Sequence, residues 1–243
     1  MSGERVLIVD DDLKLSDQVS AYLTQQGLEP SCAMVGNEAL SLLADHAFDL
    51  VLLDVILPGM DGLAVCRKIR EGSHIPIIMV TAIGDEAAKV QMLQTGADDY
   101  VVKPFSLPEL HARMLAVLRR SRLPRVGDES PEFSSGELNI DYRSHQVTFA
   151  GKGIELTATE FNLLKELASH AGEVMTHRTL LHSVWGLEYG DEREYVRVFV
   201  NRLRQKLGDD PASPKFIRTE AGVCRLLPIP ALWLGPIGPA GLS

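Results

Sequence analysis

The first half of the chain alternates short apolar runs with longer amphipathic stretches. Four runs rich in aliphatic and β-branched residues stand at Val6–Val9, Leu50–Leu53, Ile75–Val80 and Tyr100–Val102, and a weaker strand is predicted near Glu29–Met34. Such near-continuous apolar runs are typical of strands buried on both faces of a parallel sheet. The stretches between them carry apolar residues at helical spacing. Residues 1–120 therefore predict a five-stranded, doubly wound α/β domain.

The second half of the chain follows a different pattern. Residues 121–132 mix Pro, Gly, Ser and both charges and predict a linker. Residues 133–227 predict an α+β domain with short strands near 138–140, 146–149 and 154–156, helices near 158–170, 176–185 and 192–207, and a closing strand pair near 215–219 and 223–227. Residues 228–243 hold four prolines, three glycines and no charge, which predicts a disordered tail.

Polar residues follow four of the five predicted strands. Asp10 and Asp11 follow the first strand, Asp54 the third, Thr81 the fourth and Lys103 the fifth. The carboxyl ends of the strands are where such sheets build their sites. Three neighbouring carboxylates repel one another, and a hard cation such as Mg2+ offsets that charge. A carboxylate can also accept a phosphoryl group, with a lysine and a hydroxyl beside it.

Each aspartate taken alone could simply form a turn or cap a helix. That interpretation is favoured for Asp12 and Asp61, each of which precedes a helical pattern. Capping alone does not explain why acids, a hydroxyl and an ammonium group occur together at four strand ends. The set favours phosphoryl chemistry at this edge of the sheet.

The motifs Val6–Asp12, Leu50–Gly62, Met79–Ala82 and Gly96–Phe105 resemble the receiver domain of response regulators, over nearly all of residues 4–120. The resemblance implies that Asp54 accepts a phosphoryl group from a sensor histidine kinase, and that Thr81 and Lys103 contact it. It also implies a reorienting aromatic residue at Tyr100 and a cis Lys103–Pro104 bond. The implied Mg2+ ligands are Asp10, Asp11, Asp54 and the Ile56 carbonyl.

The same resemblance extends to a surface for homodimerisation on phosphorylation. Its matching positions are Lys89, Asp98, Asp99, Glu109, Arg113 and Arg120, with ion pairs expected for Lys89 with Glu109 and Asp99 with Arg113. Position 94 is Gln where an acid usually faces the Arg120 position. Without the resemblance, this would be a solvated helix face with an i,i+4 pair of Glu109 and Arg113.

The formal net charge of −9 argues against a nucleic-acid binder, but the charges are unevenly distributed. Residues 1–120 carry 10 basic and 17 acidic side chains, whereas residues 193–206 carry five basic and one acidic. On a helix, Val196, Val200, Leu203 and Leu207 form one apolar stripe, and an Arg/Asn stripe lies beside it. Arginine reads guanine and asparagine reads adenine in the major groove. A solvated charged face is the alternative.

The motifs Leu156–Leu164, Thr179–Gly186, Val198–Leu207 and Asp209–Thr219 resemble the winged helix-turn-helix effector of OmpR/PhoB-type regulators, over about residues 133–227. The resemblance implies contacts to promoter DNA by Arg197, Val198, Asn201, Arg202 and Arg204, with Arg218, Thr219 and the Ala221–Gly222 turn in the wing. It also implies that the Trp185–Asp191 loop meets RNA polymerase. The wing departs from the family: Gly222–Leu226 lacks the usual Gly-Tyr pair.

The sequence thus predicts a transcription regulator rather than an enzyme, and several alternatives stay open. The three scattered cysteines, Cys32, Cys66 and Cys224, suggest idle thiols in a reducing cytoplasm, and no signal peptide or membrane span is visible. A phosphatase of the haloacid-dehalogenase type would need an acid where Ile56 stands. A flavodoxin-like carrier would need a Ser/Thr/Gly-rich loop where Asp10–Asp12 stand. A constitutive DNA binder with a silent receiver would not need the complete acid, Thr and Lys set.

Overall fold

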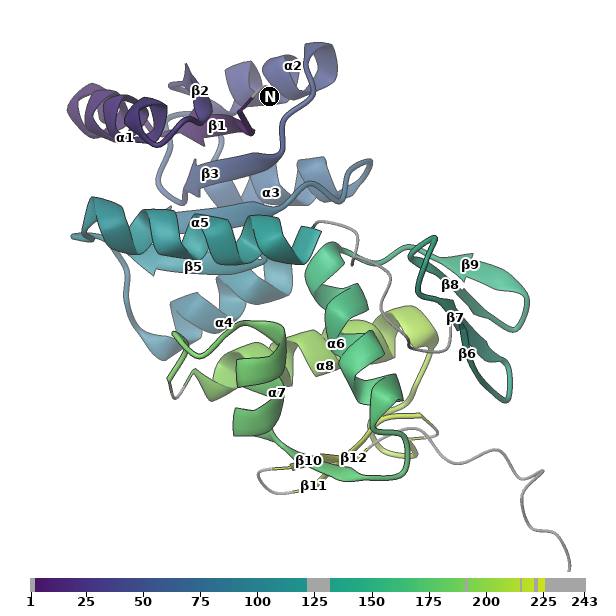
Figure 1. Ribbon diagram of the computed structural model, residues 1–243. Helices are drawn as coiled ribbons and strands as arrows, with labels where there is room; N and C mark the ends of the chain where they lie inside the picture. The colour runs from purple at the N-terminus through teal and green to yellow at the C-terminus, as the bar shows by residue number, and fades with distance from the viewer. Residues whose placement is uncertain (1–2, 122–131, 191, 215, 221–222, 226–243) are drawn as a thin grey trace, which may run out of the picture.

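The structure, a computed structural model, describes residues 3–121, 132–190, 192–214, 216–220 and 223–225 (Figure 1). Most of the predicted linker, the Ala221–Gly222 turn and the predicted tail lie outside these residues. Among the helices of the described part, none is both long enough and apolar enough to cross a bilayer.

The N-terminal domain is built on a five-stranded parallel sheet with the strand order β2-β1-β3-β4-β5. The elements alternate along the chain as predicted: β1 (Arg5–Val9), α1 (Leu13–Gln25), β2 (Glu29–Ala33), α2 (Gly36–Asp45), β3 (Leu50–Asp54), α3 (Gly62–Arg70), β4 (Ile77–Thr81), α4 (Glu86–Thr95), β5 (Asp99–Val102) and α5 (Leu107–Ser121). The predicted doubly wound fold is confirmed.

Successive residues of each strand face opposite sides of the sheet, and both sides are covered. Val6, Ile8, Leu50 and Leu52 pack with the buried residues of α1 and α5. The alternate residues of β1 and β3 pack with those of α2, α3 and α4. Burial on both faces explains why these strands read as nearly continuous apolar runs.

Two of the helices begin at the aspartates for which capping was favoured. The Asp12 carboxylate accepts hydrogen bonds from the Lys14 and Leu15 amides at the start of α1. The Asp61 carboxylate accepts one from the Ala64 amide at the start of α3, at 2.6 Å. Both capping predictions are confirmed, and both aspartates hold the loops that carry the acidic residues.

The C-terminal domain combines an antiparallel four-stranded sheet, three helices and a second small sheet. Its elements are β6 (Glu132–Ser135), β7 (Leu138–Asp141), β8 (Gln146–Phe149), β9 (Lys152–Ile154), α6 (Ala158–Ser169), β10 (Val174–Thr176), α7 (His177–Val184), α8 (Arg193–Leu207), β11 (Arg218–Glu220) and β12 (Val223–Arg225). The sequence did not predict β6 or β10. Each has only three or four residues and too little alternation to stand out.

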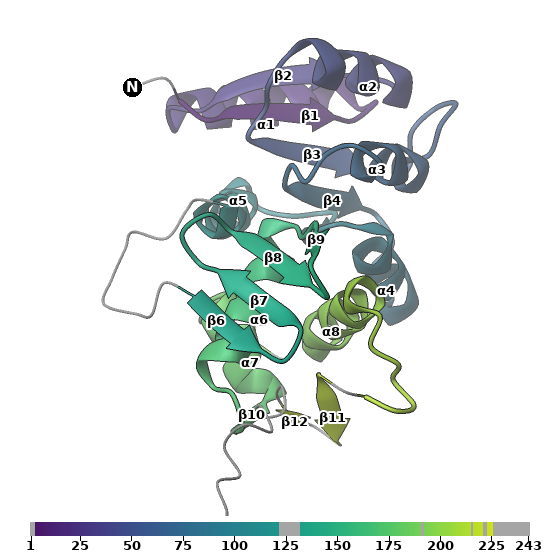
Figure 2. The ribbon, with the colours of Figure 1, turned by 90° about the vertical axis from the view of Figure 1, so that its right-hand side faces the viewer.

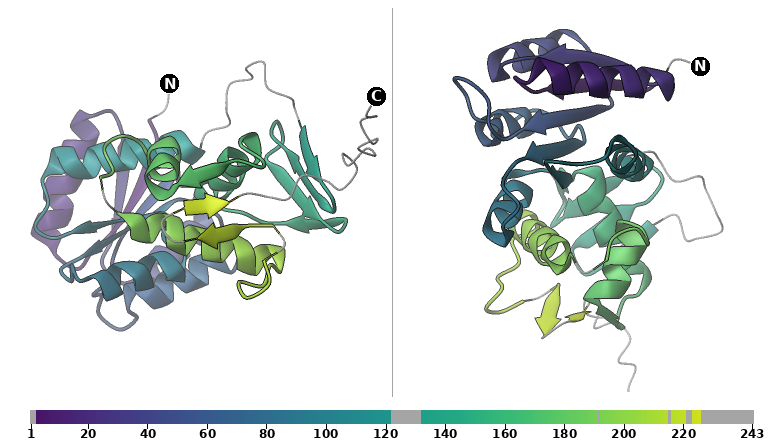
Figure 3. Two further views of the ribbon diagram at one scale, coloured as in Figure 1. Left: turned by 90° about the horizontal axis from the view of Figure 1, so that it is seen from below. Right: turned by 90° about the vertical axis from the view of Figure 1, so that its left-hand side faces the viewer.

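The two domains lie against each other through helices. α8 packs beside α4, and α6 packs beside α5, as the views in Figures 1 and 2 agree. The strands β11 and β12 lie on the side of the C-terminal domain away from the parallel sheet, nearest the viewer in the left panel of Figure 3. The helix with the basic stripe is thus one of the two helices that pack against the N-terminal domain.

Candidate functional site

Three carboxylates meet at the carboxyl edge of the parallel sheet. Asp10 follows β1 and Asp54 ends the neighbouring strand β3. One carboxylate oxygen from each of Asp10, Asp11 and Asp54 lies within 4.8 Å of the others. Asp10 and Asp54 are each only 5% exposed, whereas Asp11 is open to solvent. The pocket therefore combines two buried acids with one accessible acid.

A single ammonium group faces the two buried acids. Lys103, just after β5, donates from Nζ to Asp10 Oδ2 at 2.7 Å and to Asp54 Oδ2 at 2.6 Å. Burial raises the pKa of Asp54, and the hydrogen bonds from Lys103 and the Ile56 amide counter only part of this effect. Burial alone would lower the pKa of Lys103, but its bonds to both carboxylates outweigh it and leave that pKa raised. Lys103 is therefore a firmly charged bridge between the acids.

The donor set fits a hard divalent cation. All three candidate ligands are carboxylate oxygens, and one ammonium cannot balance three negative charges. Asp10, Asp11 and Asp54 would hold such an ion. Ile56, whose carbonyl the resemblance adds as a ligand, lies beside them, and its amide donates to Asp54 Oδ1 at 2.9 Å. A bound Mg2+ would supply charge neutralisation for an incoming phosphoryl group.

Thr81 stands next to the acid pocket. Asp54 pairs with Val80 in the sheet, so Thr81 extends β4 by one residue beyond the position opposite Asp54. Its side chain is 1% exposed, and its Oγ1 accepts a hydrogen bond from the Ile83 amide at 3.0 Å. The Lys103–Pro104 peptide bond that follows β5 is cis, as the resemblance implied.

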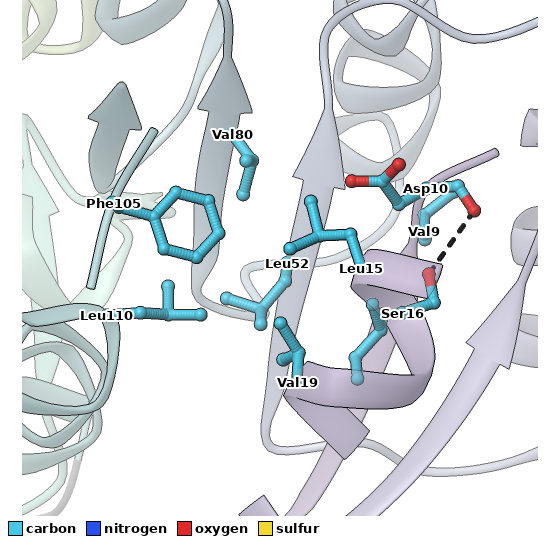
Figure 4. Close-up of a pocket in the computed structure, with 10 residues that line it drawn as sticks. Val9, Asp10, Leu15, Ser16, Val19, Leu52, Val80, Phe105 and Leu110 are labelled. Carbon is cyan, nitrogen blue, oxygen red and sulfur yellow. Dashed lines mark hydrogen bonds between the residues drawn. The ribbon is translucent and has the colours of Figure 1, made fainter. Parts of the chain in front are cut away.

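A small cavity lies beneath the acid pocket, between α1 and α5 (Figure 4). Its lining is almost entirely apolar, including Leu52, Val80 and Phe105, and Asp10 stands at its margin. The Ser16 hydroxyl donates to the Asp10 carbonyl at 3.5 Å. This cavity belongs to the core that dehydrates the acids.

The surface predicted for dimerisation is covered by the C-terminal domain of the same chain. Asp99 is fully buried, and its carboxylate accepts hydrogen bonds from the Tyr189 and Tyr195 hydroxyls. Tyr100 donates from its hydroxyl to Glu194 Oε1 at 2.9 Å, and its ring stacks on that of Tyr195 with centroids 5.4 Å apart. All three partners belong to the loop before α8 or to its first turn.

The other predicted dimer residues lie around the same contact. The Lys89 ammonium lies 5.5 Å from the centre of the Tyr100 ring. Arg113 approaches Asp99 at 3.5 Å and Glu109 at 3.6 Å, the second being the i,i+4 pair. Asp98 pairs with Arg70 at 2.9 Å and accepts a hydrogen bond from the Thr159 hydroxyl of α6, also at 2.9 Å. Arg120, 4% exposed, donates to the Trp185 carbonyl at 3.3 Å.

The residues predicted to contact DNA divide into an exposed and a buried group. Arg197 and Asn201 of α8 are exposed, as are Arg218 and Thr219 of β11. Val198, Arg202 and Arg204 are buried, at 3%, 9% and 5% exposure. The basic stripe therefore does not present a single continuous face to solvent.

Arg204 and Arg202 are occupied by protein partners rather than open to a base edge. Arg204 donates to the Ile217 carbonyl at 2.6 and 3.2 Å and to Thr219 Oγ1 at 3.0 Å, which ties α8 to the chain leading into β11. Arg202 pairs with the buried Glu160 at 2.8 Å and donates to the Leu93 carbonyl in α4 and the Ala97 carbonyl just after it. Burial of an arginine requires such partners.

Comparison with known proteins fits both halves of this arrangement. The family model described as the response regulator receiver domain matches residues 6–115, and the model of the C-terminal domain of transcriptional regulatory proteins matches residues 151–224. Among similar solved structures is that of DrrB, a Thermotoga maritima OmpR/PhoB homologue. Its sequence is 32% identical to this chain, the match covers 93% of this chain and 100% of DrrB, and the TM-score is 0.50. The chain belongs to the OmpR/PhoB family of response regulators. The C128D mutant of RitR is 28% identical over 92% of this chain and 99% of its own, with a TM-score of 0.74.

In this response regulator, the altered wing is built around a cysteine. Cys224 of β12 is fully buried and stands opposite Met175 of β10 and Thr219 of β11. Burial raises the pKa of its thiol to about 11, so Cys224 fills space as a small apolar side chain. Cys66 is also buried, and only Cys32 is exposed.

The sequence did not mark the effector residues that reach into the receiver. Glu194, Tyr189, Tyr195 and Thr159 touch receiver residues that are 61 to 96 positions away in the chain. Hydrophobic periodicity reports on neighbours within one element and carries no information on such pairs. The unusual density of aromatic and acidic residues in Trp185–Tyr195 was the one visible signal.

Proposed function

We propose that this response regulator is a transcription factor switched by Mg2+-dependent phosphorylation of Asp54 from a sensor histidine kinase. The observation that carries the proposal is the acid pocket, in which Asp54 lies with Asp10 and Asp11 and is bridged to Asp10 by Lys103. The cation held by Asp10, Asp11 and Asp54, with the Ile56 carbonyl, would draw a phosphoryl donor toward the Asp54 carboxylate. Lys103 and Thr81 would then bind its oxygens.

Incubation of the full chain with acetyl phosphate and Mg2+ tests the acceptor. The wild type should gain one phosphoryl group, seen by intact-protein mass spectrometry, and Asp54→Asn should gain none. Asp45→Asn, at an exposed position of α2, is the matched control and should label like the wild type. Full labelling of Asp54→Asn would assign the acceptor to another residue. Chelation of Mg2+ should suppress labelling of the wild type.

The output of the switch is the binding of two effector domains to promoter half-sites. Pairing of receivers through α4, β5 and α5 would raise the effective concentration of the second effector. Arg197 and Asn201 are exposed on α8 and suit base edges, and Arg218 and Thr219, which are exposed on β11, would lie near the minor groove. Val198, Arg202 and Arg204 would join them only after a rearrangement, and for Arg204 that would break bonds within its own domain.

The loop from Trp185 to α8 would meet RNA polymerase. Leu187 in this loop is 82% exposed, which is the highest exposure among the large apolar side chains of the described residues. Asn201→Ala separates DNA binding from phosphorylation, since it should abolish discrimination between the target promoter and random duplex while Asp54 still labels. Unchanged discrimination would exclude Asn201 from the DNA contact.

A further inference from the structure

A pocket of about 500 Å³, here called the α4–α8 pocket, lies where α8 of the effector packs beside α4 of the receiver. Small molecules bind in pockets of roughly 300–1,000 Å³, so this one has room for a ligand that touches both domains. Its walls are formed by Gln94 of α4 and by side chains of α8 that include Val198, Asn201, Arg202, Arg204 and Gln205.

Two buried guanidinium groups line the pocket, and only one of them has an acid as its partner. Arg202 pairs with the buried carboxylate of Glu160 at 2.8 Å. Arg204 is 5% exposed, and its hydrogen bonds go to neutral oxygen atoms, among them the Ile217 carbonyl and the Thr219 hydroxyl. Within the described part of the chain Arg204 forms no ion pair. Because a buried charge is costly without a compensating one, an anion in the pocket would stabilise Arg204.

The carboxylate that lines the pocket has other partners. Asp209 is 4% exposed, and its oxygens accept hydrogen bonds from the Phe216 and Ile217 amides, so it does not pair with Arg204. Glu160 pairs with Lys206 at 2.7 Å as well as with Arg202. Among the described lining side chains and their ion-pair partners, three cations therefore meet two acids, which leaves one positive charge in excess.

The other polar groups of the pocket are carboxamides. Gln94, Asn201 and Gln205 are exposed, and each of their amides can both donate and accept hydrogen bonds. Val198 and Pro211 add apolar surface beside them. Guanidinium groups bind phosphate through paired hydrogen bonds, and carboxamides match the edges of nucleobases. The residue types that suit DNA on an open helix here surround a space of molecular size.

We propose that the α4–α8 pocket binds a nucleoside phosphate, with the phosphate near Arg204 and the base among the carboxamides. Gln94 and Gln205 would hydrogen-bond the base from the two domains. Asn201 would contact the ligand, so a bound nucleotide would exclude DNA from this part of α8. That competition rests on the function proposed above, whereas binding of the nucleotide does not.

Calorimetric titration of the full chain with AMP, GMP, CMP, UMP and inorganic phosphate tests the site. EDTA is included so that no divalent cation can carry a nucleotide to the acid pocket. At least one nucleotide should bind roughly tenfold more tightly than inorganic phosphate, the factor that a net hydrogen bond to the base of about 1.4 kcal/mol gives. Affinity for every nucleotide no higher than that for phosphate, or no binding at all, would overturn the proposal.

Charge substitutions at an exposed carboxamide locate the site. Gln94→Glu should weaken nucleotide binding roughly tenfold, because the new carboxylate repels the phosphate, and Gln94→Lys should bind more tightly than Gln94→Glu. Gln94 belongs to the receiver, so these variants separate the pocket from the DNA-contacting residues of α8. Gln25→Glu, at an exposed position of α1, adds the same charge elsewhere and should match the wild type.

A cooperative thermal transition verifies that each Gln94 variant is folded. Equal nucleotide affinities for Gln94→Glu and Gln25→Glu would place the nucleotide elsewhere and overturn the assignment to the α4–α8 pocket. The same conclusion would follow if Gln94→Glu and Gln94→Lys weakened binding equally, because loss of the amide rather than the sign of the charge would then decide the affinity.

Fluorescence anisotropy with a random duplex measures the competition, at an ionic strength held constant with KCl. At ten times its Kd, the tightest nucleotide should lower the apparent affinity of the wild type for DNA by roughly tenfold. Gln94→Glu should need a correspondingly higher nucleotide concentration for the same effect. A nucleotide that binds in the calorimeter and leaves DNA affinity unchanged would support the pocket and overturn the competition, and with it the proposed DNA contact of Asn201.

Discussion

Lys103 supplies positive charge that partly balances the carboxylates of the acid pocket. It is the cationic partner of both Asp10 and Asp54, and its raised pKa keeps it charged throughout the neutral pH range. The raised pKa of Asp54 shows that burial of its carboxylate is unfavourable even with the lysine in place. The ammonium and a bound Mg2+ would therefore compensate for the same excess of negative charge.

Replacing Lys103 by Met should make the protein depend on the metal. We expect the free energy of unfolding without Mg2+ to fall by about 2–3 kcal/mol, somewhat below the cost of breaking a fully buried pair, because Lys103 is partly exposed. Saturating Mg2+ should restore more stability to the variant than it adds to the wild type. Urea unfolding with and without MgCl2 measures both, and Lys68→Met on α3 is the exposed control. Equal increments from Mg2+ in both proteins would contradict this account.

At the scale of elements, the sequence predicted most of what a local pattern can report. Four of the five parallel strands were readable because burial on both faces produces apolar runs that polar loops interrupt, whereas β2, which is mostly exposed or half-buried, gave only a weak signal. Asp12 and Asp61 were recognisable as caps from their place before a helical period. The short strands β6 and β10 were not predicted, because three or four residues cannot display a period and their pairing partners lie elsewhere in the chain.

The start of α3 fixes where Asp54 lies. A Cβ added at Gly62 would stand 1.9 Å from the Asp54 carbonyl oxygen, so only glycine allows α3 to begin this close to β3. Gly62→Ala should cost about 3 kcal/mol or more, the upper range for overpacking, because the obstacle is backbone and cannot move aside. It should also slow labelling of Asp54 by acetyl phosphate.

Gly72 offers the control for this prediction. A Cβ there would meet no atom within 4 Å, so Gly72→Ala should leave the free energy of unfolding unchanged or slightly higher. Chemical denaturation of both variants compares the two sites in one domain. A Gly62→Ala protein as stable as Gly72→Ala would show that α3 can shift without cost.

At the scale of the whole molecule, the sequence located the surfaces but not their partners. The resemblance marked Asp99 and Arg113 as part of one surface, and the helical pattern together with the resemblance marked α8 as another. That the two surfaces close on each other within one chain depends on the packing of Tyr189, Glu194 and Tyr195, which no local pattern reveals. The buried Arg202 shows the same limit, because its charge suggested a DNA contact whereas its partners are Glu160 and the Leu93 and Ala97 carbonyls.

The uneven distribution of charge also affects how the two domains together bind DNA. The receiver, with 17 acidic and 10 basic side chains, lies beside the helix that carries the basic segment. It can reduce binding to DNA phosphates in two ways, by electrostatic repulsion and by covering α8. Salt separates the two, because repulsion between exposed charges is screened beyond about 10 Å at 0.1 M ionic strength, whereas a covered surface stays covered.

The isolated effector, residues 132–243, should therefore bind random duplex more tightly than the unphosphorylated full chain, by roughly tenfold or more at low salt. Fluorescence anisotropy titrations at several salt concentrations measure both affinities, after circular dichroism and a cooperative thermal transition have shown that the fragment is folded. The ratio of the two affinities should shrink as salt screens the receiver's negative charge and then level off above one, because α8 is still covered in the full chain. If the ratio falls to one at high salt, electrostatic repulsion explains the whole difference in affinity, and the covering of α8 contributes nothing to it. A ratio that does not change with salt would leave covering alone, and the acidity of the receiver would then have no part in holding the resting protein off DNA.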